Sequence, residues 1–118
     1  MATEVEILKP KQDSEHVYSE EYRDAVVFEV LGLDAVVIQL VDLDGLGSWP
    51  ASLVLSVEGS LDNSFFGQLP GGAIPYSAFG IGAAISVTGL AYLRVIVSTV
   101  SASGHGNVGV RATGARSV

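Results

Sequence analysis

The sequence contains no cysteine, which excludes a disulfide framework and any thiolate metal site. Its stability must therefore come from burial of apolar side chains, from pairing of strands, or from assembly with other copies of the chain. Long apolar runs are also missing, because none approaches the roughly 18 residues that cross a bilayer. Residues 1–16 are too polar for a signal peptide. We therefore expect a soluble protein with no membrane partner.

Acidic residues are missing from the chain after Asp62. All 13 Asp and Glu lie at or before Asp62, so residues 1–62 carry 13 acids against three bases, a formal charge of -10. The remainder carries three arginines and no acid, and the net charge is -7. Such a field repels phosphate, and no basic patch is interleaved with aromatic residues. We predict no nucleic-acid partner.

Catalytic motifs are missing as well. No G-x-S-x-G, H-E-x-x-H or G-x-x-x-x-G-K-[ST] pattern occurs, and nothing brings His16 and His105 together. Asp34, Asp42 and Asp44 offer oxygen ligands beside a glycine turn, but no Glu closes a calcium loop. We predict a protein that is not an enzyme and that has no cofactor and no metal site.

The stretch SGHGNVG at residues 103–109 contains G-x-G-x-x-G after a strand-like run. A dinucleotide-binding turn needs a following helix and an acidic residue about 20 positions further on. Only nine residues follow Gly109, and none of them is acidic. We interpret the stretch as a glycine-rich connection between two strands, with His105 at its tip.

What the sequence does contain, from residue 25 onward, is short β-branched runs separated by turn residues at intervals of about ten, which is typical of a sandwich or barrel. A chain of 118 residues with 48% hydrophobic residues suffices for one domain. We predict an all-β, antiparallel, jelly-roll-like sandwich of about seven or eight strands over residues 25–118. The expected strands span 25–31, 35–41, 52–58, 84–87, 90–101 and 107–113.

Alternation within these runs predicts the core. In two of the expected strands the inward residues are Leu53, Leu55, Val57 and Leu93, Val95, Val97, whereas Tyr92 and Arg94 point outward or line an interface. We expect residues 107–113 to pair with 90–101 as an antiparallel hairpin across the glycine turn. Residues 59–83 contain prolines and glycines, which favour long loops with one or two edge strands.

Residues 1–24 hold most of the charge and form an expected N-terminal arm. A short helix over residues 14–22 is one interpretation, because Val17, Tyr18 and Tyr22 fall near one helical face. The sequence leaves two alternatives open: a solvated, partly mobile terminus, or an ordered arm that docks on a partner. For the second, the candidate contact residues are Tyr18, Tyr22 and Arg23.

Three further aromatic residues are weaker candidates for partner contacts. Trp49, next to Pro50, could be a sugar-stacking platform, an interface anchor or a cap on the core. Phe65 and Phe66 are adjacent in a polar, glycine-flanked stretch, and each also fits a core position. A carbohydrate site usually needs two or three exposed aromatic side chains.

Residues 53–69, LVLSVEGSLDNSFFGQL, contain a strand of the form V-x-G-S-x-D-[GN] followed by aromatic residues and a leucine. With Y-L-R-V at 92–95 and V-x-V-x-A at 108–112, this pattern resembles small structural proteins of tailed phages. The chain departs from the pattern where Phe65-Phe66 replaces the usual single tryptophan. The resemblance implies a β-sandwich virion component, which is a head decoration or cement protein or a fibre base, and no catalytic residues.

From this resemblance we expect a capsid accessory protein, made in the host cytoplasm and located on the capsid surface, that binds between major capsid subunits. A mean hydropathy of +0.44 in a chain without cysteine favours apolar surface covered by neighbouring copies, and we expect a homotrimer. The acidic arm would meet basic patches on the capsid. The alternative is a carbohydrate-binding or fibre-base module for attachment, and a hydrolase is a third interpretation that would require His105 near a serine and a carboxylate.

Overall fold

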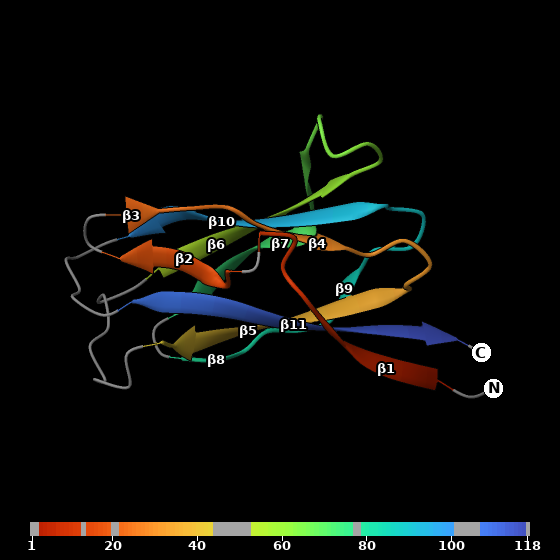
Figure 1. The fold of residues 1–118 in the computed structure, drawn as a ribbon, viewed down its shortest axis with the longest axis horizontal. Coiled ribbons are helices and arrows are strands. Elements are labelled where there is room, and N and C mark those ends of the chain that lie inside the picture. The colour runs from red at the N-terminus through yellow and green to blue at the C-terminus, as the bar shows by residue number, and fades with distance from the viewer. Residues whose placement is uncertain are drawn as a thin grey trace.

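The structure is a computed structural model that describes residues 3–12, 14–19, 22–43, 53–76, 79–100 and 107–117. Every regular element in these ranges is a β-strand, arranged in two antiparallel sheets that pack against each other (Figure 1). The described residues include no helix that could cross a membrane. The predicted all-β antiparallel sandwich is confirmed, and its jelly-roll strand order stays a prediction.

The larger sheet is built around its last strand. Its order is β3-β2-β11-β5-β8, with β1 also paired to β11 and β9 to β5. One edge of β11 pairs with β5. Its other edge pairs with β2 near the start of β11 and with β1 along the second half of β11. The strands are β1 (Thr3–Leu8), β2 (His16–Ser19), β3 (Tyr22–Arg23), β5 (Ala35–Asp42), β8 (Gly80–Ile81), β9 (Ile85–Ser86) and β11 (Val108–Ser117).

The smaller sheet has the order β4-β10-β6-β7, with β4 (Val26–Glu29), β6 (Leu53–Ser60), β7 (Gly67–Tyr76) and β10 (Tyr92–Val100). Pro70 and Pro75 lie in β7, which is an edge strand, the place where a missing backbone donor costs least. The register of β7 against β6 shifts between Ser56 and Glu58, so part of β7 bulges out. The expectation of an edge strand in the irregular region is confirmed.

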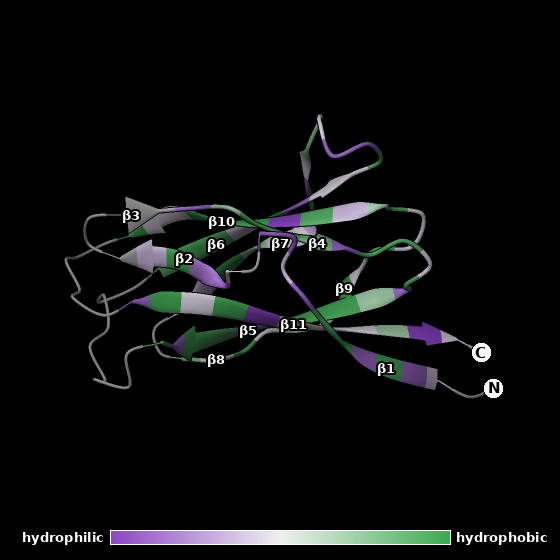
Figure 2. Ribbon diagram, viewed as in Figure 1, coloured by the Kyte–Doolittle hydropathy of each residue, from purple (hydrophilic) through white to green (hydrophobic). Residues whose placement is uncertain are grey.

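The core lies between the sheets and follows the predicted alternation. Figure 2 shows hydrophobic and hydrophilic residues alternating along β10 and β11. Side chains on alternate positions of three strands are buried together, as a half-buried strand requires. They are Val36, Ile38 and Leu40 of β5, Leu53, Leu55 and Val57 of β6, and Leu93, Val95 and Val97 of β10.

The predicted hairpin between the last two long strands is wrong. β10 pairs with β4 and β6 in the smaller sheet, whereas β11 lies in the larger sheet. The chain therefore crosses from one sheet to the other between residues 100 and 108. Alternation shows which side of a strand is buried, but both sheets bury one side, so the pattern does not tell which sheet a strand joins. The glycine turn itself, with His105, lies outside the described residues.

The helical interpretation of residues 14–22 is also wrong, because this segment contains β2 and the start of β3. Val17 and Tyr18 are buried in the core, and the β2 backbone pairs with β11. Pairing with a strand that lies 90 residues away in the sequence has overridden a weak local preference. The described strands of residues 3–23 thus belong to the larger sheet of the same sandwich.

The outer edge of β4 is covered by the N-terminal segment. The backbone N–H of Lys11 donates to the carbonyl of Val27 at 2.8 Å, and the N–H of Val27 donates to the side-chain oxygen of Gln12 at 3.3 Å. Lys11 also forms an ion pair with Glu29. Exposed strand edges invite unwanted pairing with other chains, and these contacts block that edge.

Candidate protein-interaction site

The turn between β6 and β7 stands clear of both sheets (Figure 1). Two large apolar side chains are exposed on it, Leu61 at 74% and Phe65 at 83%. A single exposed apolar residue is ordinary, whereas two on one projecting turn make this turn a candidate for a protein contact. We refer to residues 61–66 as the β6–β7 loop.

Hydrogen bonds within the chain fix the conformation of this loop. The Ser60 hydroxyl oxygen accepts the backbone N–H groups of Asp62 at 3.2 Å and Asn63 at 3.0 Å. Asp62 Oδ1 accepts the backbone N–H groups of Ser64 at 2.8 Å and Phe65 at 3.1 Å, and the Ser60 hydroxyl at 3.0 Å. Asn63 adopts a φ of 64°, which asparagine tolerates better than most residues. The S-x-D-N motif therefore builds a preorganised turn.

These hydrogen bonds also fix the charge on the loop. The N–H of Phe65, then that of Ser64, then the Ser60 hydroxyl lower the pKa of Asp62, because each stabilises the carboxylate form. The loop consequently presents a negative charge between Leu61 and Phe65 at neutral pH.

The base of the loop is held against β10. The guanidinium carbon of Arg94 lies 4.2 Å from the centroid of the Phe66 ring, and the same guanidinium forms a 2.6 Å ion pair with Glu58. Phe66 is half-buried by this contact, while its neighbour Phe65 is exposed. The two adjacent phenylalanines therefore have different tasks: Phe66 anchors the loop, and Phe65 is available to a partner.

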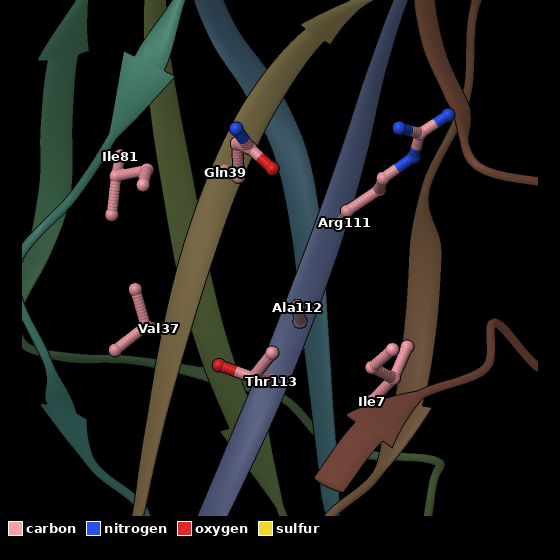
Figure 3. Close-up of a pocket in the computed structure, with 7 residues that line it drawn as sticks. All are labelled: Ile7, Val37, Gln39, Ile81, Arg111, Ala112 and Thr113. Atoms are coloured by element: carbon pink, nitrogen blue, oxygen red, sulfur yellow. The ribbon is translucent and has the colours of Figure 1, made fainter. Parts of the chain in front are cut away.

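A second apolar surface lies on the outward face of the larger sheet (Figure 3). The strand register places Ile7 beside Thr113 and Thr113 beside Val37, in a row across β1, β11 and β5. In the next row Arg111 and Ile81 lie on either side of Gln39. These side chains, together with Ala112, whose own side chain is buried in the core, line a shallow pocket of about 220 Å³, which we call the sheet-face pocket.

The sheet-face pocket has apolar walls and a charged rim. Ile7 is 81% exposed and Ile81 is 70% exposed, and they stand on opposite sides of the smaller Thr113. Arg111 donates from Nε and Nη2 to the two carboxylate oxygens of Glu15, both at 2.9 Å, as a bidentate pair. An apolar centre with a polar rim is how protein interfaces are commonly built.

The structure places the residues predicted from sequence as follows. Tyr18 is buried in the core, which leaves it little surface for a partner. Tyr22 and Arg23 form β3 at the end of the larger sheet, and their side chains lie outside the described set. Trp49 also lies outside the described residues. Phe65 and Phe66 share the β6–β7 loop, as described above.

Sequence reasoning missed Leu61, Ile7 and Ile81. Leu61 occupies the variable position of the S-x-D-N motif, so the motif did not mark it. Ile7 belongs to an alternation of glutamate and apolar residues in β1, a strand pattern that the charge of the segment obscured. Ile81 lies in a two-residue strand among glycines, where no periodicity is measurable.

The structure describes one of the two histidines, and the acidic residues that it describes are the other candidates for a metal site. His16 Nε2 lies 3.1 Å from Asn107 Oδ1, which joins the start of β2 to the start of β11. No group of three or more His, Asp or Glu side chains within the described ranges could hold a metal ion. The hydrolase interpretation concerns His105, which lies outside those ranges.

Comparisons with known proteins give one informative likeness. No protein-family model matches the chain, and no curated protein matches it in sequence. The crystal structure of the SPBc2 prophage-derived protein YomS is similar, with a TM-score of 0.63 at 12% sequence identity. The similarity covers 98% of this chain and 96% of that one. The two proteins therefore share their fold from end to end.

Proposed function

We propose that this protein is a structural component of a tailed-phage virion and serves as a head decoration protein that binds between major capsid subunits. The observation that carries the proposal is the end-to-end fold correspondence with a prophage-derived protein. The resemblance of the S-x-D-N strand to tailed-phage structural proteins supports the same assignment independently of that comparison. The role is one of binding rather than catalysis.

Charge supports an attachment to a basic surface. Residues 1–62 carry a formal charge of -10, and a strongly acidic surface attracts positively charged patches while it repels nucleic acid. β3, with Tyr22 and Arg23, ends the strand order of the larger sheet. A terminal strand offers backbone groups as well as side chains to a partner. We therefore propose β3 and its surroundings as the surface that contacts the capsid.

The carbohydrate-binding alternative receives less support. Stacking of a sugar ring uses two or three exposed aromatic side chains. Among the aromatic residues whose side chains the structure describes, Phe65 is exposed, whereas Phe66, Phe79 and Tyr92 are half-buried and the others are buried. One exposed ring on a loop fits a protein contact better than a sugar platform.

Co-sedimentation with purified heads of the phage that carries the gene tests the proposal. We expect binding that saturates at a fixed number of copies per head. The double substitution Tyr22→Ala/Arg23→Ala should weaken binding by about tenfold or more, as loss of an anchor pair does. Leu31→Ser is the matched control, because Leu31 is 76% exposed on a different turn. Absence of wild-type protein from the head pellet at saturating concentration would contradict the decoration role.

Deletion of the whole charged N-terminal segment would not test this surface cleanly. Removal of residues 1–24 would take away β1, β2 and the buried side chains of Val17 and Tyr18. Loss of binding by such a truncated chain would reflect a damaged core. Point substitutions in β3 avoid this ambiguity.

A further inference from the structure

The chain carries both an apolar projection and an apolar recess. The β6–β7 loop emerges from the smaller sheet with Leu61 and Phe65 exposed. The sheet-face pocket lies on the larger sheet, on the side opposite the core, because its Val37 and Gln39 alternate with the buried Val36, Ile38 and Leu40. The projection and the recess of one molecule therefore face different directions and cannot cover each other.

We propose that the β6–β7 loop of one copy inserts Phe65 into the sheet-face pocket of a neighbouring copy and packs Leu61 against the rim of that pocket, so that the protein assembles head to tail. A contact between two different surfaces is heterologous, and it generates a closed ring when the rotation between copies closes. The inference deepens the proposed function, and it rests on that function for the expectation that the ring is a trimer. It names the surfaces through which the trimer forms.

Size and polarity support the fit. The pocket of about 220 Å³ has room for one large apolar side chain, and its walls are Ile7, Val37 and Ile81. The loop offers such a side chain on a backbone that is already fixed by the Ser60 and Asp62 hydrogen bonds. Because the loop is preorganised, little conformational entropy is lost when it binds. Insertion would remove the most exposed phenylalanine and the exposed isoleucines from water together.

Charge complementarity selects the second copy as the occupant. The loop carries the ionised Asp62 between its two apolar residues, and the pocket rim carries Arg111. The bidentate pair with Glu15 takes two of the five N–H donors of Arg111, and its side chain is 60% exposed. The N–H donors of Arg111 that Glu15 does not use can therefore donate to the Asp62 carboxylate of the incoming loop, which favours this orientation over a contact between two like faces.

Two variants, each lacking one of the surfaces, test the head-to-tail contact. Leu61→Ser/Phe65→Ser removes the apolar side chains of the β6–β7 loop and keeps Ser60 and Asp62, which hold its backbone. Ile7→Lys/Ile81→Lys removes the recess. All four side chains are exposed, so each variant should fold, as circular dichroism and thermal unfolding will check. Leu31→Ser serves as the matched exposed-to-polar control.

Sedimentation velocity should show a ring for the wild type and for Leu31→Ser, and monomers for each double variant. Loss of either surface should weaken association more than about tenfold, since each double substitution removes two large buried side chains. An equimolar mixture of the two double variants should form a one-to-one dimer and nothing larger, because only one intact projection and one intact recess remain.

Three results would overturn the inference. They are a wild-type protein that stays monomeric at high concentration, a Leu61→Ser/Phe65→Ser variant that keeps the wild-type assembly, and a mixture of the variants that stays monomeric. Head co-sedimentation of the same samples separates this inference from the proposed function. A monomer that binds heads overturns the ring alone, and a ring that ignores heads overturns the decoration role alone.

Discussion

The guanidinium carbon of Arg94 lies 4.2 Å from the centroid of the Phe66 ring and so joins the start of β10 to the loop that follows β6. Arg94 also pairs with Glu58 on β6, which stands directly opposite Arg94 in the strand register. One side chain thus connects a cross-strand ion pair to the base of the projecting loop. Phe66, which is held in this way, directly follows the exposed Phe65.

Replacement of Arg94 by alanine should lower the free energy of unfolding by about 1 kcal/mol, because it removes a cation–π contact and a partly exposed ion pair. Arg94→Lys keeps the charge and loses the planar stacking on Phe66, so its loss should be smaller. Urea unfolding at neutral pH measures both. An Arg94→Ala variant that is as stable as the wild type would show that the contact between Arg94 and Phe66 does not hold the loop.

Asp62 should make stability depend on pH below the ordinary carboxyl range. Its pKa is lowered in the folded chain by the backbone N–H groups of Phe65 and Ser64 and by the Ser60 hydroxyl. Its contribution is therefore present above pH 3.8, the unperturbed value, and is lost as the pH falls through the lower folded pKa. A carbon-13 titration of the Asp62 carboxyl should show a midpoint below 3.8. A midpoint at or above that value would contradict the hydrogen-bonded turn.

Two glycines should be intolerant of a side chain for backbone reasons alone. Gly32 and Gly89 each have a φ of +85° in turns closed by hydrogen bonds from Leu33 to Val30 and from Leu90 to Val87. An added Cβ would meet nothing within 4 Å at either glycine. Substitution of either glycine by alanine should thus lower the free energy of unfolding by about 1 kcal/mol, because of the strained backbone conformation alone.

Gly67→Ala is the control for these two substitutions. A Cβ at Gly67 also meets nothing within 4 Å, but its φ is not positive. This variant should match the wild type or gain slightly in thermal stability, because alanine restricts the unfolded chain. Equal losses at all three positions would remove the backbone explanation.

Tyr76 should limit stability at alkaline pH. Its ring is buried, its hydroxyl donates to the carbonyl of Ile38 across the two sheets at 3.4 Å, and burial raises the pKa of the phenol above 10.0. The stability from the neutral phenol is complete below pH 10.0 and is lost as the pH rises through the raised folded pKa. Tyr76→Phe should lose less stability than the wild type between neutral and strongly alkaline pH. Equal pH dependence of the two proteins in urea unfolding would contradict this assignment.

The core strands could be predicted because each buries one side only. Alternation at Leu53, Leu55 and Val57, and again at Leu93, Val95 and Val97, fixed which side chains point inward, and the structure buries all six. The prolines of β7 likewise marked an edge strand. These features follow from local physics, which the sequence carries directly.

Pairing over long distances could not be predicted in this way. β1 joins β11 across more than 100 positions, and its exposed glutamates gave the segment the character of a solvated arm. For the same reason the sequence predicted a hairpin of β10 and β11, although the two strands lie in different sheets. Phe65 and Phe66 were both candidates for contact, but only the position of Arg94 distinguishes the anchored ring from the exposed one.

The central proposal, that this protein is part of a virion, is tested most directly by quantitative mass spectrometry of gradient-purified virions from cells that express the gene. A head decoration protein should be present in a fixed ratio to the major capsid protein, and it should remain with the heads when tails are removed. Absence of the protein from infectious purified particles, while it is abundant in the infected cell, would contradict the account.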